Sequence, residues 1–391
     1  MKKVIEEIVK LDQIVPGGQA LGQLADGRKV FVWGGLPGET VRIRLTKLKK
    51  SYAEAIVIEV IESSSDRIAP RDDCYLSTSP WQIMTEAAEV QHKSDLVVES
   101  FRQVGVTVPW QEIRGDGKFY HYRNKMEYSL WWDHDTARIW PAFHRRGSHQ
   151  KILVESSSIE RPEIWVEAQR IIAELNANGD EARHYQSLLI RCNQVGVVSS
   201  GLFEMNQPRP IMTQLSDQIL GYDYTYSPNG FFQINLPVYE LALREMQPFI
   251  NTNKVIDMYS GVGTIGLSVA RDTDLTLVET DTHAYAELEH NIPVGSNRIH
   301  GVHAKSEEAL EYITGDATTI VDPPRAGLDD KVTTRILEVK PPRVIYLSCN
   351  PATQARDVAR LVSDYDIIHS QPFNFFPRTP HIENLVVLQL K

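Results

Sequence analysis

One stretch of the sequence, residues 254–267, constrains the fold more than any other. An apolar run ends at Asp257, a glycine-rich turn follows, and helical spacing resumes after the turn. A strand, a glycine turn and a helix in this order are typical of a parallel α/β sheet of the Rossmann kind. The turn at residues 261–266 matches G-x-G-x-x-G, a pattern that taken alone also suggests a nicotinamide dinucleotide.

Two details of this turn differ from a dinucleotide-binding loop. Asp257 and the polar Ser260 precede the first glycine, whereas a dinucleotide fingerprint runs an apolar strand directly into it. The order D-x-x-x-G-x-G resembles the loop with which Rossmann-like methyltransferases bind S-adenosylmethionine. The next apolar run ends at Glu279, and an acidic residue about 20 positions after the first strand suits the hydroxyls of a ribose. Because both cofactors contain a ribose, Glu279 supports the fold without choosing between them.

A second strand-to-helix turn carries a cysteine. Residues 344–347 are apolar and β-branched or aromatic, which predicts a buried strand, and Asn350 followed by Pro351 is typical of a helix N-terminus. Cys349 therefore precedes a helix N-terminus, a position that lowers the pKa of a thiol. Cys349 is a candidate nucleophile, although most free cysteines are buried and inert, and the turn alone leaves both interpretations open.

A stiff loop follows a third predicted strand, residues 318–321. It begins at Asp322, continues through two prolines and reaches Arg325. Ligands bind at the carboxyl edge of open α/β sheets, so this loop is expected in the site. Amino-group methyltransferases carry a similar loop that ends in an aromatic residue, and Arg325 in that place argues against methylation of an exocyclic amine.

The first 61 residues alternate short β-rich runs with glycine turns, which predicts a small, OB-like closed barrel. The pattern resembles a TRAM domain, a barrel attached to many RNA-modifying enzymes. Arg42 and Arg44 share one face of a predicted strand and precede several lysines. They fit either a phosphate-contacting stripe or an edge strand guarded by charge.

Polar residues 63–73 indicate a linker, and the region up to about residue 225 mixes helical and strand patterns, so we expect a central α/β or α+β domain. Ser79 is expected to cap a helix that runs to about Val104. Basic and aromatic residues alternate at 121–125 and 144–146, which favours contact with RNA through Arg123 and Lys125, with ordinary surface charge as the alternative.

Six motifs then occur in a fixed order, at residues 231–235, 257–263, 279–281, 322–327, 348–351 and 376–383. Together they resemble the RNA (uracil-5-)methyltransferase family of the RumA and TrmA type. The resemblance implies S-adenosylmethionine as cofactor, Cys349 as a nucleophile that adds to carbon 6 of uracil, and Glu383 as the proton acceptor, with a pKa raised by burial. It assigns cofactor binding to Gln233, Tyr259, Gly261, Gly263, Glu279 and Asp322, and uracil contacts to Asp322 and Arg325.

The sequence departs from this family in two places. Many members hold a four-iron, four-sulfur cluster with four cysteines, three of them grouped after the barrel. Here only Cys74 remains in that region, and Cys192 cannot complete four ligands with it, so we predict neither a cluster nor a bound metal. Thr264 stands where many members have asparagine, which puts one cofactor contact in doubt.

We therefore predict three domains: a TRAM-like barrel at 1–61, a central RNA-binding domain at 62–225, and a Rossmann-like class I methyltransferase domain at 226–391. The expected activity is formation of 5-methyluridine, with ribosomal RNA favoured and the T-loop of transfer RNA as the alternative. A nicotinamide-dependent oxidoreductase and a non-catalytic RNA-binding protein remain as other classes. The net charge of −10 requires a local basic patch for RNA, and we expect a cytoplasmic monomer without a membrane segment.

Overall fold

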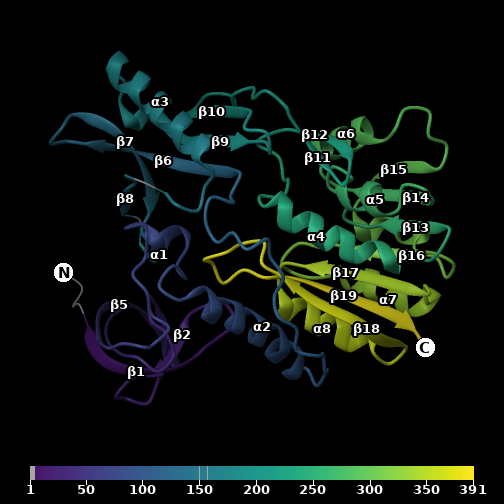
Figure 1. Ribbon diagram of the computed structural model, residues 1–391, viewed down its shortest axis with the longest axis horizontal. Helices are drawn as coiled ribbons and strands as arrows, with labels where there is room; N and C mark the ends of the chain where they lie inside the picture. The colour runs from purple at the N-terminus through teal and green to yellow at the C-terminus, as the bar shows by residue number, and fades with distance from the viewer. Residues whose placement is uncertain (1–4, 149, 156) are drawn as a thin grey trace.

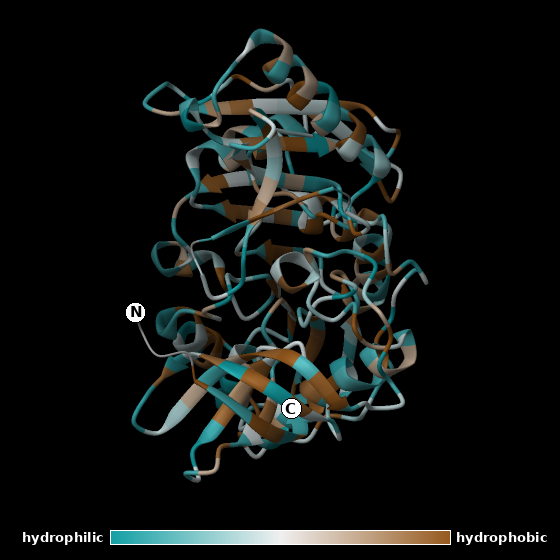
Figure 2. Cartoon of the chain, turned by 90° about the vertical axis from the view of Figure 1, so that its left-hand side faces the viewer, coloured by the Kyte–Doolittle hydropathy of each residue, from teal (hydrophilic) through white to brown (hydrophobic). Residues whose placement is uncertain are grey.

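A computed structural model describes residues 5–148, 150–155 and 157–391 (Figure 1). The chain begins with five strands that close into a barrel in the order β1-β2-β3-β5-β4. These strands are β1 (Glu6–Ile14), β2 (Ala20–Gln23), β3 (Lys29–Trp33), β4 (Thr40–Leu48) and β5 (Tyr52–Glu62). Alternate residues such as Val30 and Val32 of β3 point inward and are fully buried, and Figure 2 shows hydrophobic and hydrophilic residues mixed along these strands at the bottom of the view. The predicted barrel is confirmed.

The basic strand β4 is not an edge of this barrel. It pairs with β1 on one side and with β5 on the other. The edge-strand interpretation of Arg42 and Arg44 is therefore wrong. Arg42 also forms an ion pair with Glu59, whose Nε–Oε2 distance is 2.8 Å, so part of the predicted basic stripe is neutralised.

The central region contains an antiparallel sheet in the order β10-β9-β6-β7-β8. Its strands are β6 (Lys125–Asp133), β7 (Arg138–His144), β8 (Lys151–Leu153), β9 (Tyr185–Cys192) and β10 (Val198–Glu204), and the helices of this part are α1 (Tyr75–Thr78), α2 (Glu86–Arg102) and α3 (Pro162–Asn178). Helix α3 packs Ile164, Ala168 and Ile172 onto the sheet, because residues at this spacing share one helix face. An all-antiparallel sheet with a helix on it makes this region α+β, one of the two expected arrangements.

Helix α2 differs from the prediction in its start and in its packing. It begins at Glu86 with Thr85 as its cap, whereas Ser79 is buried and accepts a hydrogen bond of 2.7 Å from the Gln82 side chain. The helix packs against α8 (Pro351–Leu361), and its Phe101 lies in one apolar core with residues of the C-terminal sheet. The predicted domain boundaries stay a prediction, but this part of residues 62–225 packs with the C-terminal region.

The C-terminal sheet has the strand order β15-β14-β13-β16-β17-β19-β18. The first five strands in this order are parallel, and β19 is inserted antiparallel between β17 and β18. The elements are β13 (Lys254–Asp257), α5 (Thr264–Val269), β14 (Asp274–Glu279), α6 (Thr282–Asn291), β15 (Ile299–His303), β16 (Thr318–Val321), α7 (Asp330–Val339), β17 (Arg343–Ser348), β18 (Tyr365–Phe373) and β19 (Glu383–Leu390). The predicted Rossmann-like fold is confirmed.

Two apolar cores cover the two faces of this sheet. One contains residues of α2, α7 and α8, and the other contains residues of α4 (Leu236–Met246), α5, α6 and the hairpin β11 (Leu215–Ile219) and β12 (Tyr222–Tyr226). All residues of β16 and β17 are buried, as expected of parallel strands covered on both faces. The carboxyl ends of β13, β14, β16 and β17 therefore form the one edge at which polar loops converge. Among the described residues, no helix has the length and apolar character needed to cross a membrane.

Candidate active site

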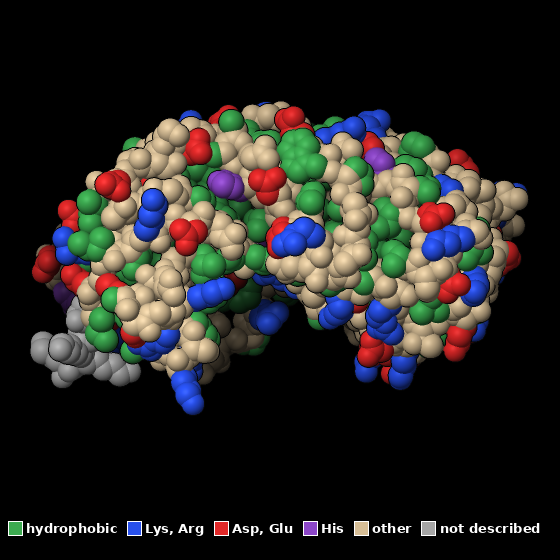
Figure 3. All heavy atoms as spheres, turned by 90° about the horizontal axis from the view of Figure 1, so that it is seen from below, with side chains coloured by type: hydrophobic (Ala, Val, Ile, Leu, Met, Phe, Trp, Pro, Cys, Tyr) green, Lys and Arg blue, Asp and Glu red, His purple; other side chains and the backbone are tan. Residues whose placement is uncertain are grey.

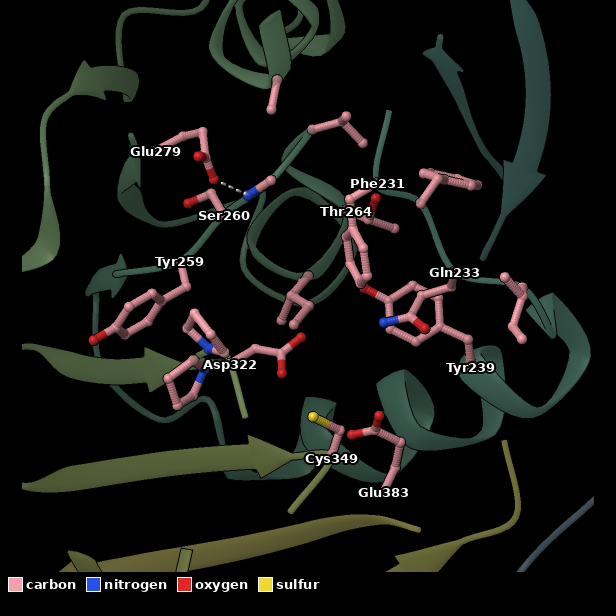
Figure 4. A pocket seen from close by; sticks show the side chains of 18 of the residues that line it. Phe231, Gln233, Tyr239, Tyr259, Ser260, Thr264, Glu279, Asp322, Cys349 and Glu383 are labelled. Atoms are coloured by element: carbon pink, nitrogen blue, oxygen red, sulfur yellow. Dashed lines mark hydrogen bonds between the residues drawn. The ribbon is translucent and has the colours of Figure 1, made fainter. Parts of the chain in front are cut away.

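A cavity of about 530 Å³ lies at the carboxyl edge of the C-terminal sheet (Figure 4). Its walls come from the glycine turn after β13, the end of β14, the loop after β16, the end of β17, the start of β19 and the segment before α4. Eight of the residues predicted from the sequence line it: Gln233, Tyr259, Gly261, Glu279, Asp322, Arg325, Cys349 and Glu383. The structure thus brings together side chains that lie up to 150 positions apart.

One end of the cavity is formed by the glycine turn and Glu279. Oε2 of Glu279 accepts a hydrogen bond of 2.8 Å from the backbone N–H of Gly261, the dashed line in Figure 4. Gly261 has a φ of +55°, and a Cβ atom there would meet nothing within 4 Å, so the backbone borders open space. A carboxylate beside a bare backbone suits the ribose of S-adenosylmethionine, and these residues fit the cofactor.

Gly263 and Asp257 support the glycine turn from outside the cavity. Gly263 has a φ of +90°, and a Cβ atom on it would lie 2.6 Å from a methyl carbon of Leu288, so it serves close packing and does not line the cavity. Oδ2 of Asp257 accepts a hydrogen bond of 3.0 Å from Gly266 N–H at the start of α5. Burial raises the pKa of Asp257 to about 7.

The other end of the cavity holds Cys349 and Glu383, and strand register explains why they meet. Ser348, the last residue of β17, pairs with Asn384 of the antiparallel neighbour β19. Cys349 follows Ser348 and Glu383 precedes Asn384, so the two residues extend the same pair of strands. Figure 4 shows both side chains pointing into the cavity, with Asp322 across from them.

The acid–base properties of this end follow from burial and like charge. Glu383 is only 4% exposed, and burial followed by the nearby Asp322 raises its pKa well above the usual range, the direction that we expected. Burial followed by the charge of Asp257 raises the pKa of Asp322 to about 8. Burial, then Glu383 and Asp322, raises the pKa of Cys349 to about 12, against a weaker opposing effect of Arg325. The expected lowering of the thiol pKa is therefore wrong for this structure.

The loop that carries Arg325 is fixed to the N-terminus of α8. The backbone oxygen of Arg325 accepts hydrogen bonds from the side chains of Asn350 and Thr353, with distances of 2.9 and 3.2 Å. Asn350 also caps α8 by accepting from Ala352 N–H, as its sequence position predicts. The exposed guanidinium of Arg325 lies 3.4 Å from Nδ1 of His381 at the mouth of the cavity.

Arg123 and Lys125, predicted to bind RNA, do not line the cavity. Lys125 donates to the backbone oxygens of Asn229 and Gly230, at 3.3 and 3.0 Å, and so holds the segment that precedes Gln233. Burial, followed by the charges of Arg325, Lys93, Arg123 and Arg146, lowers the pKa of His381 to about 4.

Two further cavity residues, Tyr239 and Phe376, were missed by the sequence analysis. Phe376 begins the last of the six motifs and could have been identified from it, whereas Tyr239 lies inside α4 and carries no signal of its own.

The other two cysteines are far from this chemistry. Cys74 and Cys192 are both buried, and burial raises their pKa values to about 12 and about 11. Within the described ranges no group of three or more His, Cys, Asp or Glu residues is placed to hold a metal ion. The absence of an iron–sulfur cluster stays a prediction, for which colourless purified protein without iron absorbance is the check.

Comparison with known proteins agrees with this geometry. Residues 296–391 match the tRNA (uracil-5-)-methyltransferase family, and residues 7–58 match the TRAM domain. An uncharacterized RNA methyltransferase of Thermosynechococcus vestitus is 28% identical over 97% of both chains, and one of Bacillus anthracis is 27% identical over 93% of this chain and 92% of that protein.

Among solved structures, the fold is similar to that of the Pyrococcus abyssi tRNA (uracil-54, C5)-methyltransferase in complex with S-adenosyl-L-homocysteine. The TM-score is 0.78 and the identity 21%, over 98% of this chain and 100% of that one. Residues 296–391 therefore carry a tRNA (uracil-5-)-methyltransferase family domain and residues 7–58 a TRAM domain, and nearly the whole chain is similar to RNA methyltransferases.

Proposed function

We propose that this RNA (uracil-5-)methyltransferase forms 5-methyluridine through a covalent adduct between Cys349 and carbon 6 of the target uracil. The observation that carries the proposal is the register of β17 and β19, which places a thiol and a buried carboxyl side by side in the cavity that fits the cofactor. One group can attack the ring and the other can accept a proton from it.

The steps follow from the two side chains. The thiolate of Cys349 adds to carbon 6, and the electron pair of the C5–C6 double bond moves onto the ring as an enolate. When bound, S-adenosylmethionine would supply a methyl group on a positively charged sulfur; carbon 5 would accept the methyl group, and the sulfur would leave as a neutral thioether. Glu383 then removes the proton from carbon 5, the double bond re-forms, and the bond to Cys349 breaks. A carboxylate with a raised pKa is a suitable base for this last step.

The remaining cavity residues hold the partners in place. The glycine turn at Gly261, together with Glu279, would receive the ribose, and Gln233, Tyr259 and Asp322 would contact the rest of the cofactor. Arg325 at the mouth opposes the rise in the pKa of Cys349 and is free to meet the uracil or a phosphate. The target uridine has to leave its stack, because Cys349 is only partly accessible inside the cavity.

The mouth of the cavity suits RNA despite the negative net charge. Arg325, Arg123 and Arg146 come from different parts of the chain, and all three contribute positive charge at His381. Figure 3 shows basic side chains around the hollow in the middle of the face seen from below. A local cluster of cations around a cavity is what a phosphate backbone requires.

Ribosomal RNA is the substrate expected from the sequence, and transfer RNA is the second candidate. The barrel was the reason for favouring ribosomal RNA, but the Pyrococcus abyssi enzyme, which acts on transfer RNA, matches 98% of this chain. That observation favours the second candidate. Mass spectrometry of 5-methyluridine in separated ribosomal and transfer RNA, with and without this protein, decides between the two.

The mechanism is tested by trapping. RNA that contains 5-fluorouridine should form a stable adduct on Cys349, because fluorine at carbon 5 cannot be removed as a proton. Peptide mapping should find the adduct on Cys349, and Cys349→Ala should abolish both the adduct and methylation. Cys192→Ala, which changes a buried cysteine away from the cavity, should keep the adduct. An adduct that persists in Cys349→Ala would exclude this nucleophile.

A further inference from the structure

One wall of the cavity is a stretch without helix or strand. Residues 229–234, the pocket-wall segment, lie between β12 and α4 and include Phe231 and Gln233, which both line the cavity. Backbone carbonyls outside secondary structure need donors from elsewhere when they are buried. The position of this wall therefore depends on side chains that reach it from other parts of the chain.

Those donors come from the ends of the central strands β6 and β9. Nη2 of Arg191 donates to the backbone oxygens of Phe232 and Gln233, at 2.7 and 3.1 Å. The side chain of Asn124 also donates to Gln233 O at 3.1 Å, and its backbone N–H donates to Ile234 O at 3.1 Å. With the two bonds from Lys125, nearly every carbonyl of the pocket-wall segment is held by the central sheet.

Arg191 is an unusual residue to find in this place. It is 0% exposed, and it forms no ion pair among the described residues. Its guanidinium lies 4.8 Å from the ring centre of Tyr226 and 5.4 Å from that of Phe232, and these two rings stack at 3.9 Å. Its Nε has no hydrogen-bond partner. Burying a cation without an ion pair costs desolvation free energy, and the hydrogen bonds of Arg191 to the carbonyls of the pocket-wall segment offset part of this cost.

We propose that Arg191 is a positioning residue for methyl transfer, holding the pocket-wall segment so that Gln233 and Phe231 face the cofactor. Phe231 is 77% exposed, so packing of its side chain does not fix its position, which depends on the stacked, buried Phe232 beside it and on the backbone bonds to Arg191. Nη2 of the planar guanidinium donates to two successive carbonyls while Nη1 reaches Gly230 O at 3.5 Å, and a lysine with its single nitrogen cannot hold both places at once. The central part of the chain thereby sets the geometry of the cavity. This inference rests on the proposed function.

The test is the affinity of the full chain for S-adenosylhomocysteine, measured by titration calorimetry. Arg191→Met should weaken binding roughly 10- to 100-fold, since small misplacements of positioned groups have effects of that order. Arg191→Lys should fall between Arg191→Met and wild type. Arg170→Met is the matched control, because Arg170 is exposed on α3 and pairs only with Glu167 and Glu174, and it should bind as wild type does.

Two further readouts separate positioning from loss of stability. Binding is measured at a temperature at which thermal melts show that each variant is folded. In a separate experiment, millimolar guanidinium should restore binding to Arg191→Ala, because it replaces the missing side-chain group. KM for S-adenosylmethionine should rise while KM for RNA stays within about twofold, because no contact at the cavity mouth is altered.

Unchanged affinity in folded Arg191→Met would overturn the inference and leave the proposed function intact. If Arg191→Met does not fold, two other results together overturn the inference. These are an unchanged affinity of Arg191→Lys for S-adenosylhomocysteine and a failure of guanidinium to restore binding to Arg191→Ala. A wild-type chain that does not bind S-adenosylhomocysteine would overturn the proposed function, and this inference with it.

Discussion

The barrel and the carboxyl edge of the C-terminal sheet differ in how their charged side chains are arranged: the barrel pairs opposite charges at its surface, and the sheet edge brings like charges together. In the barrel, Arg42 and Glu59 pair at a surface where their side chains are 42% and 56% exposed. At the edge of the sheet, the carboxyls of Glu383 and Asp322 lie close together in the wall of the cavity, next to the thiol of Cys349. Exposed pairs contribute little to stability, whereas buried like charges raise the free energy of their ionised forms. The second arrangement is the one that gives reactive groups.

The largest expected effect at this edge, after loss of Cys349, is that of Glu383→Gln. The amide keeps the shape of the carboxyl but cannot accept the proton from carbon 5, so the rate should fall by about 10²- to 10⁴-fold. The methylated adduct on Cys349 should accumulate and be visible as a protein–RNA band on a denaturing gel. Normal turnover without an adduct would remove Glu383 from this role.

The same variant has an effect on stability that serves as its control. Because the pKa of Glu383 is raised in the folded protein, ionisation destabilises the fold as pH rises above the unfolded value of about 4.3. Glu383→Gln should therefore have a higher Tm than wild type at pH 8 and nearly the same Tm at pH 4. If Glu383→Gln is less stable than wild type at pH 8, the folded protein stabilises the ionised form of Glu383, and its pKa is not raised.

The next effect is the pH dependence of adduct formation. With a pKa of about 12 for Cys349, the thiolate fraction rises about tenfold with each pH unit below that value. The rate of adduct formation with 5-fluorouridine RNA should follow this slope from pH 6 to 9, corrected for RNA binding measured at each pH. A rate that levels off near pH 7 would show that RNA binding lowers the thiol pKa.

The sequence predicted which residues line the cavity more accurately than it predicted their pKa values. The turn before Asn350 made Cys349 a candidate, and the glycine turn with Glu279 predicted two residues that line the cavity, because both are local patterns. The pKa of Cys349 was mispredicted because the helix-terminus effect is short-ranged and weaker than burial beside two carboxyls. The two carboxyls are those of Asp322 and Glu383, and both lie outside the local sequence around Cys349.

Long-range contacts account for the remaining differences. The meeting of Cys349 with Glu383 follows from the register of β17 and β19, which their spacing does not reveal. Lys125 looked like an RNA contact because it is basic and next to aromatics, but it holds backbone oxygens at Asn229 and Gly230. Arg191 showed no signal, since a single arginine in an apolar strand is not distinguishable from a surface residue by pattern.

A smaller effect is expected where the two regions touch. Nε1 of Trp81 donates to Gly18 O of the barrel at 3.0 Å, and a Cβ atom on Gly18 would lie 2.2 Å from Cβ of Pro380, in the loop that leads to Glu383. Gly18→Ala should therefore displace the barrel from this loop and lower the rate of methylation several-fold, with a loss of stability of about 1–3 kcal/mol.

Gly38→Ala is the matched control for this contact. Gly38 has a similar positive φ of +85°, but a Cβ atom there meets nothing within 4 Å. Its substitution should cost only the left-handed strain of about 1–2 kcal/mol and leave the methylation rate of the folded protein unchanged. Equal rates in Gly18→Ala and Gly38→Ala would show that the barrel contact does not reach the cavity.

The smallest effect is expected for the exposed lysines of the barrel. Lys49 and Lys50 follow β4 and form no ion pair among the described residues, whereas Nζ of Lys47 lies 2.7 Å from Oε1 of Glu54. If the barrel contacts phosphates, Lys49→Ala and Lys50→Ala should each weaken RNA binding a few-fold and reduce the salt dependence by about one counterion, and Lys47→Ala should do less. Affinity for S-adenosylhomocysteine should not change in any of them. If all three variants keep the salt slope of wild type, the positive charge of the barrel has no part in RNA binding, and its contact with Pro380 becomes the main link between the barrel and the reaction.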